Sequence, residues 1–209
     1  MKATLFFDLD GTLIDSAIGI TRCVAHAFER LGEPVPDAQS LRRWIGPPLR
    51  DSFGPVLRDP ARVEQAVDFY RERFEDIGYA EHRLYDGIAD AIRTLAERGH
   101  RIAIVTAKNE PHARKIVDGF DFADRFDTIV GATLDGRISH KPELIGEALA
   151  RLALHADECV MIGDRRMDID GARHHRMRSI GVCWGFGDAD ELAQADVRVD
   201  RPDELLRVI

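Results

Sequence analysis

The chain has few cysteines and no excess of basic residues, and each shortage excludes a class of protein. Its three cysteines, Cys23, Cys159 and Cys183, are odd in number and lack paired spacing, so they predict neither a disulfide framework nor a zinc site. We expect all three to be reduced and buried as small apolar side chains. Acidic residues outnumber basic ones, 37 against 29, which gives a formal charge of −8. Because binding to a phosphate backbone requires a basic stripe, we expect no nucleic-acid polymer among the partners.

Long hydrophobic runs are also missing. A membrane-spanning helix needs about 20 consecutive apolar residues, and the longest apolar stretches fall well short of that. Near the N-terminus, Asp8 stands where a signal peptide would have its apolar centre. We therefore expect a cytoplasmic protein that does not bind membranes, while its oligomeric state stays open. The 209 residues suit one α/β domain, or one domain with a small insertion.

The first chemical signal is an apolar strand that ends in two carboxylates. Residues 3–7 (Ala-Thr-Leu-Phe-Phe) favour a central strand covered on both faces, and Asp8 and Asp10 follow before the chain turns at Gly11. Residues two apart share a face of a strand, so both carboxylates can point to one spot, where a hard divalent metal would offset their repulsion. An ordinary polar turn is the alternative. However, the string Asp-x-Asp-Gly-Thr occurs by chance in only about one chain of this length in a few hundred.

The organisation of the chain changes twice. Residues 16–83 are predicted to be helical throughout, with Ser16 capping the first helix and Gly32 ending it. The helices expected there cover residues 16–31, 37–44, 49–57 and 61–77. From Tyr85 onward helices and strands alternate, which predicts an α/β fold with a doubly wound parallel sheet. We therefore expect a core of residues 1–15 and 84–209, with residues 16–83 inserted as a separate helical lid over the carboxyl edge of the sheet.

The alternating part has its own expected boundaries. Helices are predicted at residues 88–98, 111–120, 142–154, 169–174 and 189–195. Strands are predicted at residues 101–106, 128–130, 159–162, 179–183 and 197–199.

Three further strand ends carry polar residues that belong at the same edge of such a sheet. Thr106 ends the second strand and can donate a hydrogen bond to a phosphate oxygen, although threonine at a strand end is most often structural. Lys141 opens a helix and can offset the charge of Asp8 and of a bound phosphate, although a single lysine is usually solvated. Asp164 comes after the fourth strand and Gly163, and Asp168 follows at a helix start. Both acids are expected near the proposed metal, and helix capping is the alternative role of Asp168.

Taken in order, these residues resemble the four motifs of the haloacid dehalogenase-like hydrolase superfamily. The matching segments are Asp8-Leu9-Asp10-Gly11-Thr12, Thr106, Lys141 and Gly163-Asp164-Arg165-Arg166-Met167-Asp168. The resemblance covers essentially the whole chain and implies a Rossmann-like core, and the helical insert looks like the type-1 cap of that family. The segment Ile45-Gly46-Pro47-Pro48-Leu49 resembles the substrate-facing loop of the cap. It also looks closest to the 5′-nucleotidase-like branch of the phosphoglycolate phosphatase-like group, as do residues 134–137 and 181–187.

The resemblance implies a magnesium-dependent phosphatase that acts on a small phosphorylated metabolite. Asp8 would attack phosphorus and form an aspartyl-phosphate, and Asp10 would protonate the leaving oxygen and then activate water. The implied ligands of Mg²⁺ are Asp8, the carbonyl of Asp10 and Asp164. Thr106 and Lys141 would hold the phosphoryl oxygens, while Asp168 would orient the metal or Lys141. Because dehalogenases of the superfamily lack the second aspartate, halide displacement is disfavoured.

The substrate is less well specified than the reaction. The expected substrate-binding residues are Gly11, Thr12, Ala107, Gly46 and Arg50. Ala107 stands where relatives usually carry Asn or Ser, so one polar contact of the family pattern is missing. A phosphoglycolate-like and a nucleoside-monophosphate-like substrate both stay open. So do two other functions, a phosphomutase acting on a sugar phosphate and a non-catalytic domain that binds phosphate or metal for regulation.

Overall fold

The computed structural model describes residues 2–209, so residue 1, which the expected core range includes, lies outside the described residues. Within them the core is a six-stranded parallel sheet with the strand order β5-β4-β1-β6-β7-β8. The strands are β1 (Thr4–Phe7), β4 (Ile102–Asn109), β5 (Thr128–Ala132), β6 (Cys159–Gly163), β7 (Arg178–Val182) and β8 (Val197–Val199). The predicted α/β fold with a doubly wound parallel sheet is confirmed.

The direction of winding reverses beside β1. The chain runs from β1 through β4 to β5, and then returns to the other side of β1 to add β6, β7 and β8. Ligands of open α/β sheets bind outside the carboxyl ends of the strands at such a reversal. Phe7 pairs in register with Ile162, so Asp8 follows β1 at the level of Gly163, the last residue of β6, and Asp164 comes directly after it. The topology therefore positions these two carboxylates at the same edge.

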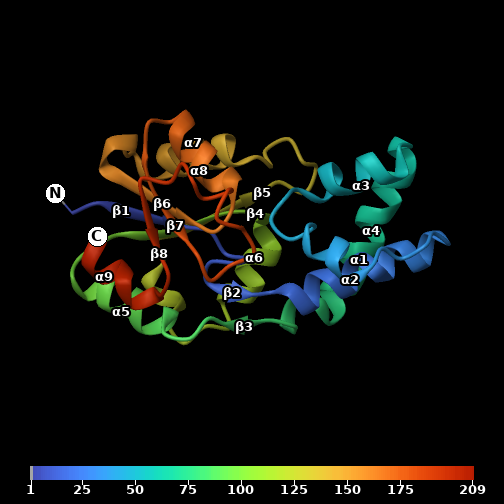
Figure 1. Cartoon of the computed structure of the whole chain (residues 1–209), viewed down its shortest axis with the longest axis horizontal. Helices are drawn as coiled ribbons and strands as arrows, with labels where there is room; N and C mark the ends of the chain where they lie inside the picture. Colours follow the sequence, from blue (N-terminus) through green and yellow to red (C-terminus); the bar gives the residue numbers. More distant parts are fainter. Residues whose placement is uncertain (1) are drawn as a thin grey trace. The chain divides into compact units, whose positions relative to one another are not determined.

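Helices cover both faces of the sheet. The helices of this part are α5 (Ile88–Glu97), α6 (Glu110–Val117), α7 (Lys141–Leu152), α8 (Arg166–His174) and α9 (Leu205–Val208). Figure 1 shows α7 and α8 on one side of the sheet and α5 and α9 on the other. Under α7 the strands bury Phe6, Ala103 and Met161 against Leu144 and Ile145. This apolar packing fixes the start of α7, and with it Lys141, over the sheet.

Contacts within the chain group the residues into two compact units, one up to Asp15 together with Leu84–Ile209, and the other Ser16–Arg83. We call them the core unit and the inserted unit. The inserted unit contains α1 (Ala17–Leu31), α2 (Ala38–Arg42), α3 (Leu49–Leu57) and α4 (Pro60–Asp76). The chain passes between the units through β2 (Ile14–Asp15) and β3 (Arg83–Leu84), a short two-stranded sheet that the sequence did not predict.

The inserted unit has an aromatic core of its own. The ring of Trp44 lies 4.8 Å from that of Phe53 and 5.6 Å from that of Phe28, both in edge-on geometry. Trp44 is 8% exposed. Its indole is therefore a packing element of this unit, because edge-on aromatic pairs stabilise a buried cluster.

The predicted helix at residues 189–195 is wrong, because the chain forms only turns there. The carboxylate of Asp188 accepts hydrogen bonds from the backbone N–H groups of Asp190 and Glu191. Such a side-chain turn competes with helix formation. The N–H of Ala195 then bonds three residues back, to the carbonyl of Leu192, so no α-helical ladder develops.

Two expectations about single side chains are also wrong. Ser16 occupies the residue before α1, but its side chain makes no capping hydrogen bond, because its backbone (φ −102°, ψ 12°) lies outside the extended geometry of a capping residue. Cys183 is exposed rather than buried, since it follows the last residue of β7 where the chain leaves the sheet. Gly32 does end α1, as expected, and its φ of 69° is a left-handed conformation that glycine adopts readily. Among residues 2–209, no helix has both the length and the apolar character to cross a membrane.

Candidate active site

Asp8 and Lys141 form the buried centre of the site. Asp8 directly follows β1, and Lys141 is the first residue of α7. The Lys141 ammonium donates to Asp8 Oδ1 at 2.5 Å and to the Val105 carbonyl at 2.7 Å, and it lies 2.7 Å from Asp168 Oδ1. Two of the three N–H groups of the ammonium are used in hydrogen bonds, and the contact with Asp168 is an ion pair. Lys141 is thus held by the residue after β1, the backbone of β4 and the first turn of α8.

Asp164 and Asp168 complete the acidic wall of the site. Asp164 follows β6, and its Oδ2 accepts a hydrogen bond from the Phe186 N–H at 2.7 Å. The Thr12 hydroxyl donates to Asp164 Oδ1 at 3.4 Å. Asp168, in the first turn of α8, accepts from the Arg165 N–H at 3.0 Å and also pairs with Lys141. Asp168 therefore caps its helix and orients Lys141 at the same time.

The buried carboxylates carry more negative charge than Lys141 can balance. Burial raises the pKa of Asp8 from 3.8 to about 7; Lys141 opposes this shift, whereas the charges of Asp168 and Asp10 add to it. Burial, followed by the charges of Asp168 and Asp8, also raises the pKa of Asp164 well above its ordinary value. Burial alone would lower the pKa of Lys141, but Asp168 and Asp8 outweigh it and raise that pKa. A bound cation would offset this repulsion between the buried carboxylates.

The donor atoms fit a hard divalent cation. One carboxylate oxygen each of Asp8, Asp164 and Asp168 lies within 4.8 Å of the others, and all three residues are buried. Such an all-oxygen group matches the ligands that Mg²⁺ and related ions prefer. Gly11, at φ +92°, leaves room for it, because a Cβ there would lie 2.6 Å from Asp164 Oδ1. The acidic triad can therefore hold a divalent metal.

Thr106 and Ala107 lie at the edge of the same site, on β4. Thr106 is buried, and its Oγ1 accepts a hydrogen bond from the Lys108 N–H at 3.2 Å, which leaves its own O–H available to donate. Ala107 packs its methyl group against the hydrophobic core on the α7 side of the sheet. The role of Thr106 as a donor to a phosphate oxygen stays a prediction, and the side chain of Ala107 offers no polar group.

Sequence reasoning missed two contributors to the site. Lys108 Nζ lies 3.0 Å from Asp10 Oδ2, so the second aspartate of the opening motif has a lysine partner of its own. The loop after β7 contributes the Phe186 N–H and the Trp184 indole, whose Nε1 donates to the Thr12 carbonyl at 3.0 Å. Regular strand alternation does not predict the position of Lys108, because the register of β4 shifts between Thr106 and Asn109. Phe186 acts through its backbone N–H, which any residue except proline would supply.

Two expected substrate-binding residues lie in the inserted unit. Gly46 has a φ of +107°, and Arg50 lies in the first turn of α3. The guanidinium of Arg50 binds both carboxylate oxygens of Glu64, at 2.7 and 2.8 Å. Within this unit, therefore, the charge of Arg50 is already matched by an acidic partner.

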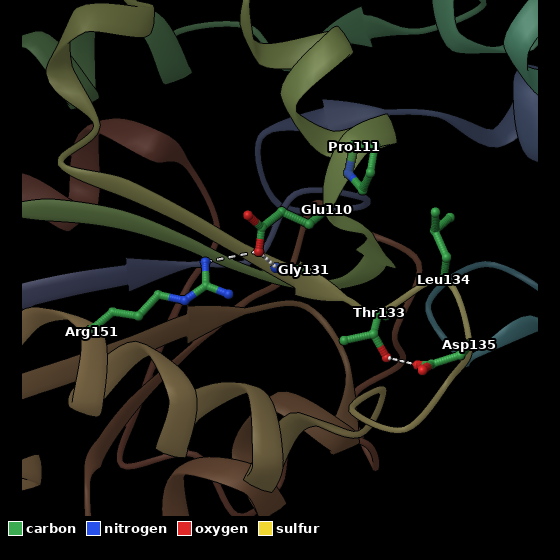
Figure 2. Close-up of a pocket in the computed structure, with 8 residues that line it drawn as sticks. Glu110, Pro111, Gly131, Thr133, Leu134, Asp135 and Arg151 are labelled. Carbon is green, nitrogen blue, oxygen red and sulfur yellow. Dashed lines mark hydrogen bonds and ion pairs between the residues drawn. The ribbon is translucent and has the colours of Figure 1, made fainter.

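A hollow of about 410 Å³ lies beside the end of β5, and none of Asp8, Asp164 and Asp168 lines it (Figure 2). Its charged side chains pair with other groups of the chain. Glu110 binds Arg151 at 2.9 Å and Arg114 at 2.8 Å, while Asp135 binds Arg137. The hollow therefore presents paired charges rather than a cluster prepared for an ion.

The parallel α/β fold and the buried acidic site at the carboxyl edge of the sheet define an enzyme-like α/β protein, and comparison with known proteins identifies its family. Residues 5–182 match the model of the haloacid dehalogenase-like hydrolase family, to which the chain belongs. It is 45% identical over 189 residues to a 5′-nucleotidase of Pseudomonas aeruginosa, covering 90% of this chain and 86% of that protein.

The chain is also similar to a kinase and to a solved structure of a predicted phosphatase. The chain is 37% identical to tyrosine-protein kinase PtkA of Mycobacterium tuberculosis, over 93% of this chain and 67% of that protein. A solved structure of a predicted phosphatase from Clostridium acetobutylicum superposes with a TM-score of 0.95 at 38% identity, covering 100% of this chain and 98% of that one. The predicted family and the predicted enzyme class, a phosphatase of this family, are confirmed.

Proposed function

We propose that the chain hydrolyses a small phosphomonoester with the help of Mg²⁺ through an aspartyl-phosphate on Asp8. The observation that carries this proposal is the buried group of Asp8, Lys141, Asp164 and Asp168 at the reversal point of the sheet. Three carboxylates against one ammonium form an arrangement that a pure packing role would avoid, because unpaired buried charge is costly. The cost is understandable where a cation and a phosphate are to be bound.

Asp8 serves as the nucleophile in this proposal. A carboxylate oxygen of Asp8 attacks phosphorus, the bond from phosphorus to the leaving oxygen breaks, and Asp10 transfers a proton to that oxygen. In the second step Asp10 takes a proton from water, whose oxygen attacks phosphorus and releases Asp8. Lys141 and the Thr106 hydroxyl hold the phosphoryl oxygens, for which one N–H of Lys141 leaves its present acceptor.

Mg²⁺, held by the Asp8 and Asp164 carboxylates and the Asp10 carbonyl, would supply positive charge that screens the repulsion between an anionic nucleophile and an anionic substrate. Asp168 keeps Lys141 in place by the 2.7 Å contact described above. Phe186 and Thr12 keep Asp164 oriented through their hydrogen bonds.

Residues 16–83 are proposed to act as the cap that selects the leaving group, with Gly46 and Arg50 as substrate contacts. We propose phosphoglycolate-like and nucleoside-monophosphate-like molecules as the substrate class. The relative named 5′-nucleotidase, at 45% identity, supports the nucleotide side of this choice. Gly11, Thr12 and the backbone of Ala107 would contact the phosphoryl group that such substrates share.

The test is a phosphate-release assay with purified protein and MgCl₂ on 2-phosphoglycolate, nucleoside monophosphates, sugar phosphates and pyrophosphate. We expect release from at least one member, and a loss on the order of 10⁴-fold in kcat for Asp8→Asn, because the nucleophile is gone. Asp118→Asn, an exposed carboxylate at the end of α6, is the matched control and should keep full activity. Release that survives in Asp8→Asn would contradict the covalent route.

The same assay separates the two alternative functions. A phosphomutase would convert a hexose phosphate into an isomer without releasing phosphate, which product analysis detects. A regulatory binding domain would release none and form no isomer. It would also show no magnesium-dependent stabilisation by beryllium fluoride, which mimics the aspartyl-phosphate.

A further inference from the structure

The two aspartates of the opening motif each have a lysine. Lys141 lies on Asp8, and Lys108 Nζ lies 3.0 Å from Asp10 Oδ2, with only 6% and 8% of the Lys108 and Asp10 side chains exposed. Removing an ammonium from water to this degree is unfavourable unless a close counter-charge compensates it. The pair of Lys108 and Asp10 is therefore a built feature of the site and differs from an exposed surface contact.

The backbone of β4 changes course to bring Lys108 to this position. β4 and β5 pair regularly as far as Thr106 and Gly131, but the next partners are Asn109 and Ala132, so Ala107 and Lys108 form a bulge. Bulges next to active sites redirect side chains. Gly131 makes room for this one, because a Cβ there would lie 2.7 Å from the Lys108 carbonyl oxygen and 2.6 Å from Glu110 N. Figure 2 shows Gly131 directly beside Glu110.

The two carboxylate oxygens of Asp10 differ in their partners. Asp10 Oδ1 is buried and has no hydrogen-bond partner among the described residues. A buried carboxylate oxygen without a partner is unfavourable, so its partner is expected to come from outside the chain. Oδ2 is paired with Lys108, whereas Oδ1 keeps its capacity to form a hydrogen bond.

We propose that Lys108 is a positioning residue, which holds Asp10 by Oδ2 so that Oδ1 faces the leaving oxygen of the substrate. This inference rests on the proposed function, in which Asp10 gives its proton to that oxygen. Lys108 itself does not touch the reacting atoms. Its loss should therefore harm catalysis only to the extent that the leaving group needs a proton.

Leaving-group dependence separates this role from two others. An alkoxide is a poor leaving group and needs protonation, whereas 4-nitrophenolate departs without it. If Lys108 bound an anionic part of the substrate, its loss would raise KM whatever the leaving group. If Lys108 only stabilised the fold, its loss would lower the fraction of active protein equally for all substrates.

The experiment measures kcat/KM with MgCl₂ for esters that run from glycerol phosphate to 4-nitrophenyl phosphate. Lys108→Met keeps the length of the side chain and removes the charge, and Lys115→Met, at an exposed position of α6, is the matched control. We expect Lys108→Met to lower kcat/KM about 100-fold for the alkyl ester and less than about threefold for the nitrophenyl ester. Lys108→Arg should restore part of the alkyl activity, and Lys115→Met should match the wild type.

A second set of variants tests whether Lys108 acts through Asp10. In Asp10→Asn, adding Lys108→Met should cause no further loss on any ester, because the group that Lys108 positions can no longer donate a proton. An equal loss across the series, or an additive loss in the double variant, would overturn the positioning role while leaving the proposed function intact. A wild type that hydrolyses no ester would overturn the proposed function, and this inference with it. If Lys108→Met melts early, Lys108→Gln gives the same comparison.

Discussion

At the scale of single residues, the buried carboxylates of the site are costly to ionise. The stability of the metal-free protein should therefore depend on pH. The pKa of Asp8 is about 7 in the folded protein, against 3.8 for the ordinary side chain. Between these two values the folded state binds more protons than the unfolded state, so the free energy of unfolding falls as pH rises from about 4 to about 7. Asp164, whose pKa is also raised, acts in the same direction. The total effect is on the order of a few kcal/mol.

Thermal unfolding in EDTA at pH 5, 6, 7 and 8 measures this effect. We expect Tm to fall with pH in the wild type, and to fall less in Asp8→Asn, which has no charge to bury. Asp118→Asn should keep the wild-type slope. MgCl₂ should raise Tm more at pH 8 than at pH 5, since a cation binds the ionised carboxylates. Parallel curves for the wild type and Asp8→Asn in EDTA would show that Asp8 is not the titrating group.

Several of the residues that sequence reasoning identified lie at or near the carboxyl ends of parallel strands. Asp8, Thr106 and Asp164 can be assigned to one sheet edge because parallel strands end together. Lys108 and Phe186 could not be assigned in this way. The first reaches Asp10 only through a bulge in β4, and the second acts through its backbone N–H, which has no residue-specific signal.

At the scale of elements, the loop that follows β7 is a structural part of the site. Gly185 lies directly against Asp164 and the Gly11 carbonyl, so that a Cβ at this position would overlap both. The loop also fixes Asp164 through the Phe186 N–H and the Thr12 carbonyl through Trp184. This close approach is possible only because residue 185 has no side chain.

Gly185→Ala should therefore displace Asp164 and weaken the binding of a divalent cation about 10- to 100-fold, as loss of a supporting contact commonly does. Calorimetric titration with MgCl₂ or MnCl₂ measures the affinity without relying on activity. Gly54→Ala is the matched control, because a Cβ at this position of α3 meets nothing within 4 Å. Equal affinities in the two variants would mean that the loop does not support the metal ligands.

Some element boundaries were predictable from the sequence, and others were wrong where local hydrogen bonds competed with the helix. The helix expected at 49–57 is found as α3, with the expected ends. The turns at residues 189–194 instead follow the Asp188 carboxylate, which bonds to two backbone N–H groups. β4 extends beyond the expected strand to Asn109, since a bulged strand continues past the polar residues that usually end one.

At the scale of the whole molecule, each compact unit contains one of the two tryptophans of the chain. Trp44 lies in the aromatic core of the inserted unit, and Trp184 lies beside Thr12 in the core unit. The proposed metal ligands all belong to the core unit. Because each unit buries side chains of its own, we expect them to unfold as separate cooperative steps, of which only one is stabilised directly by a divalent cation.

Single-tryptophan variants report the two steps by fluorescence during thermal unfolding. Trp44→Phe leaves Trp184 as reporter, and MgCl₂ at about 100 times its Kd should raise that midpoint by about 5–10 °C. Trp184→Phe leaves Trp44, whose midpoint should move by less than about 1 °C, because none of the proposed ligands of the cation belongs to the inserted unit. Adding Asp8→Asn to Trp44→Phe should remove most of the first shift. Midpoints that coincide and move together would instead show that the 209 residues unfold as one cooperative unit.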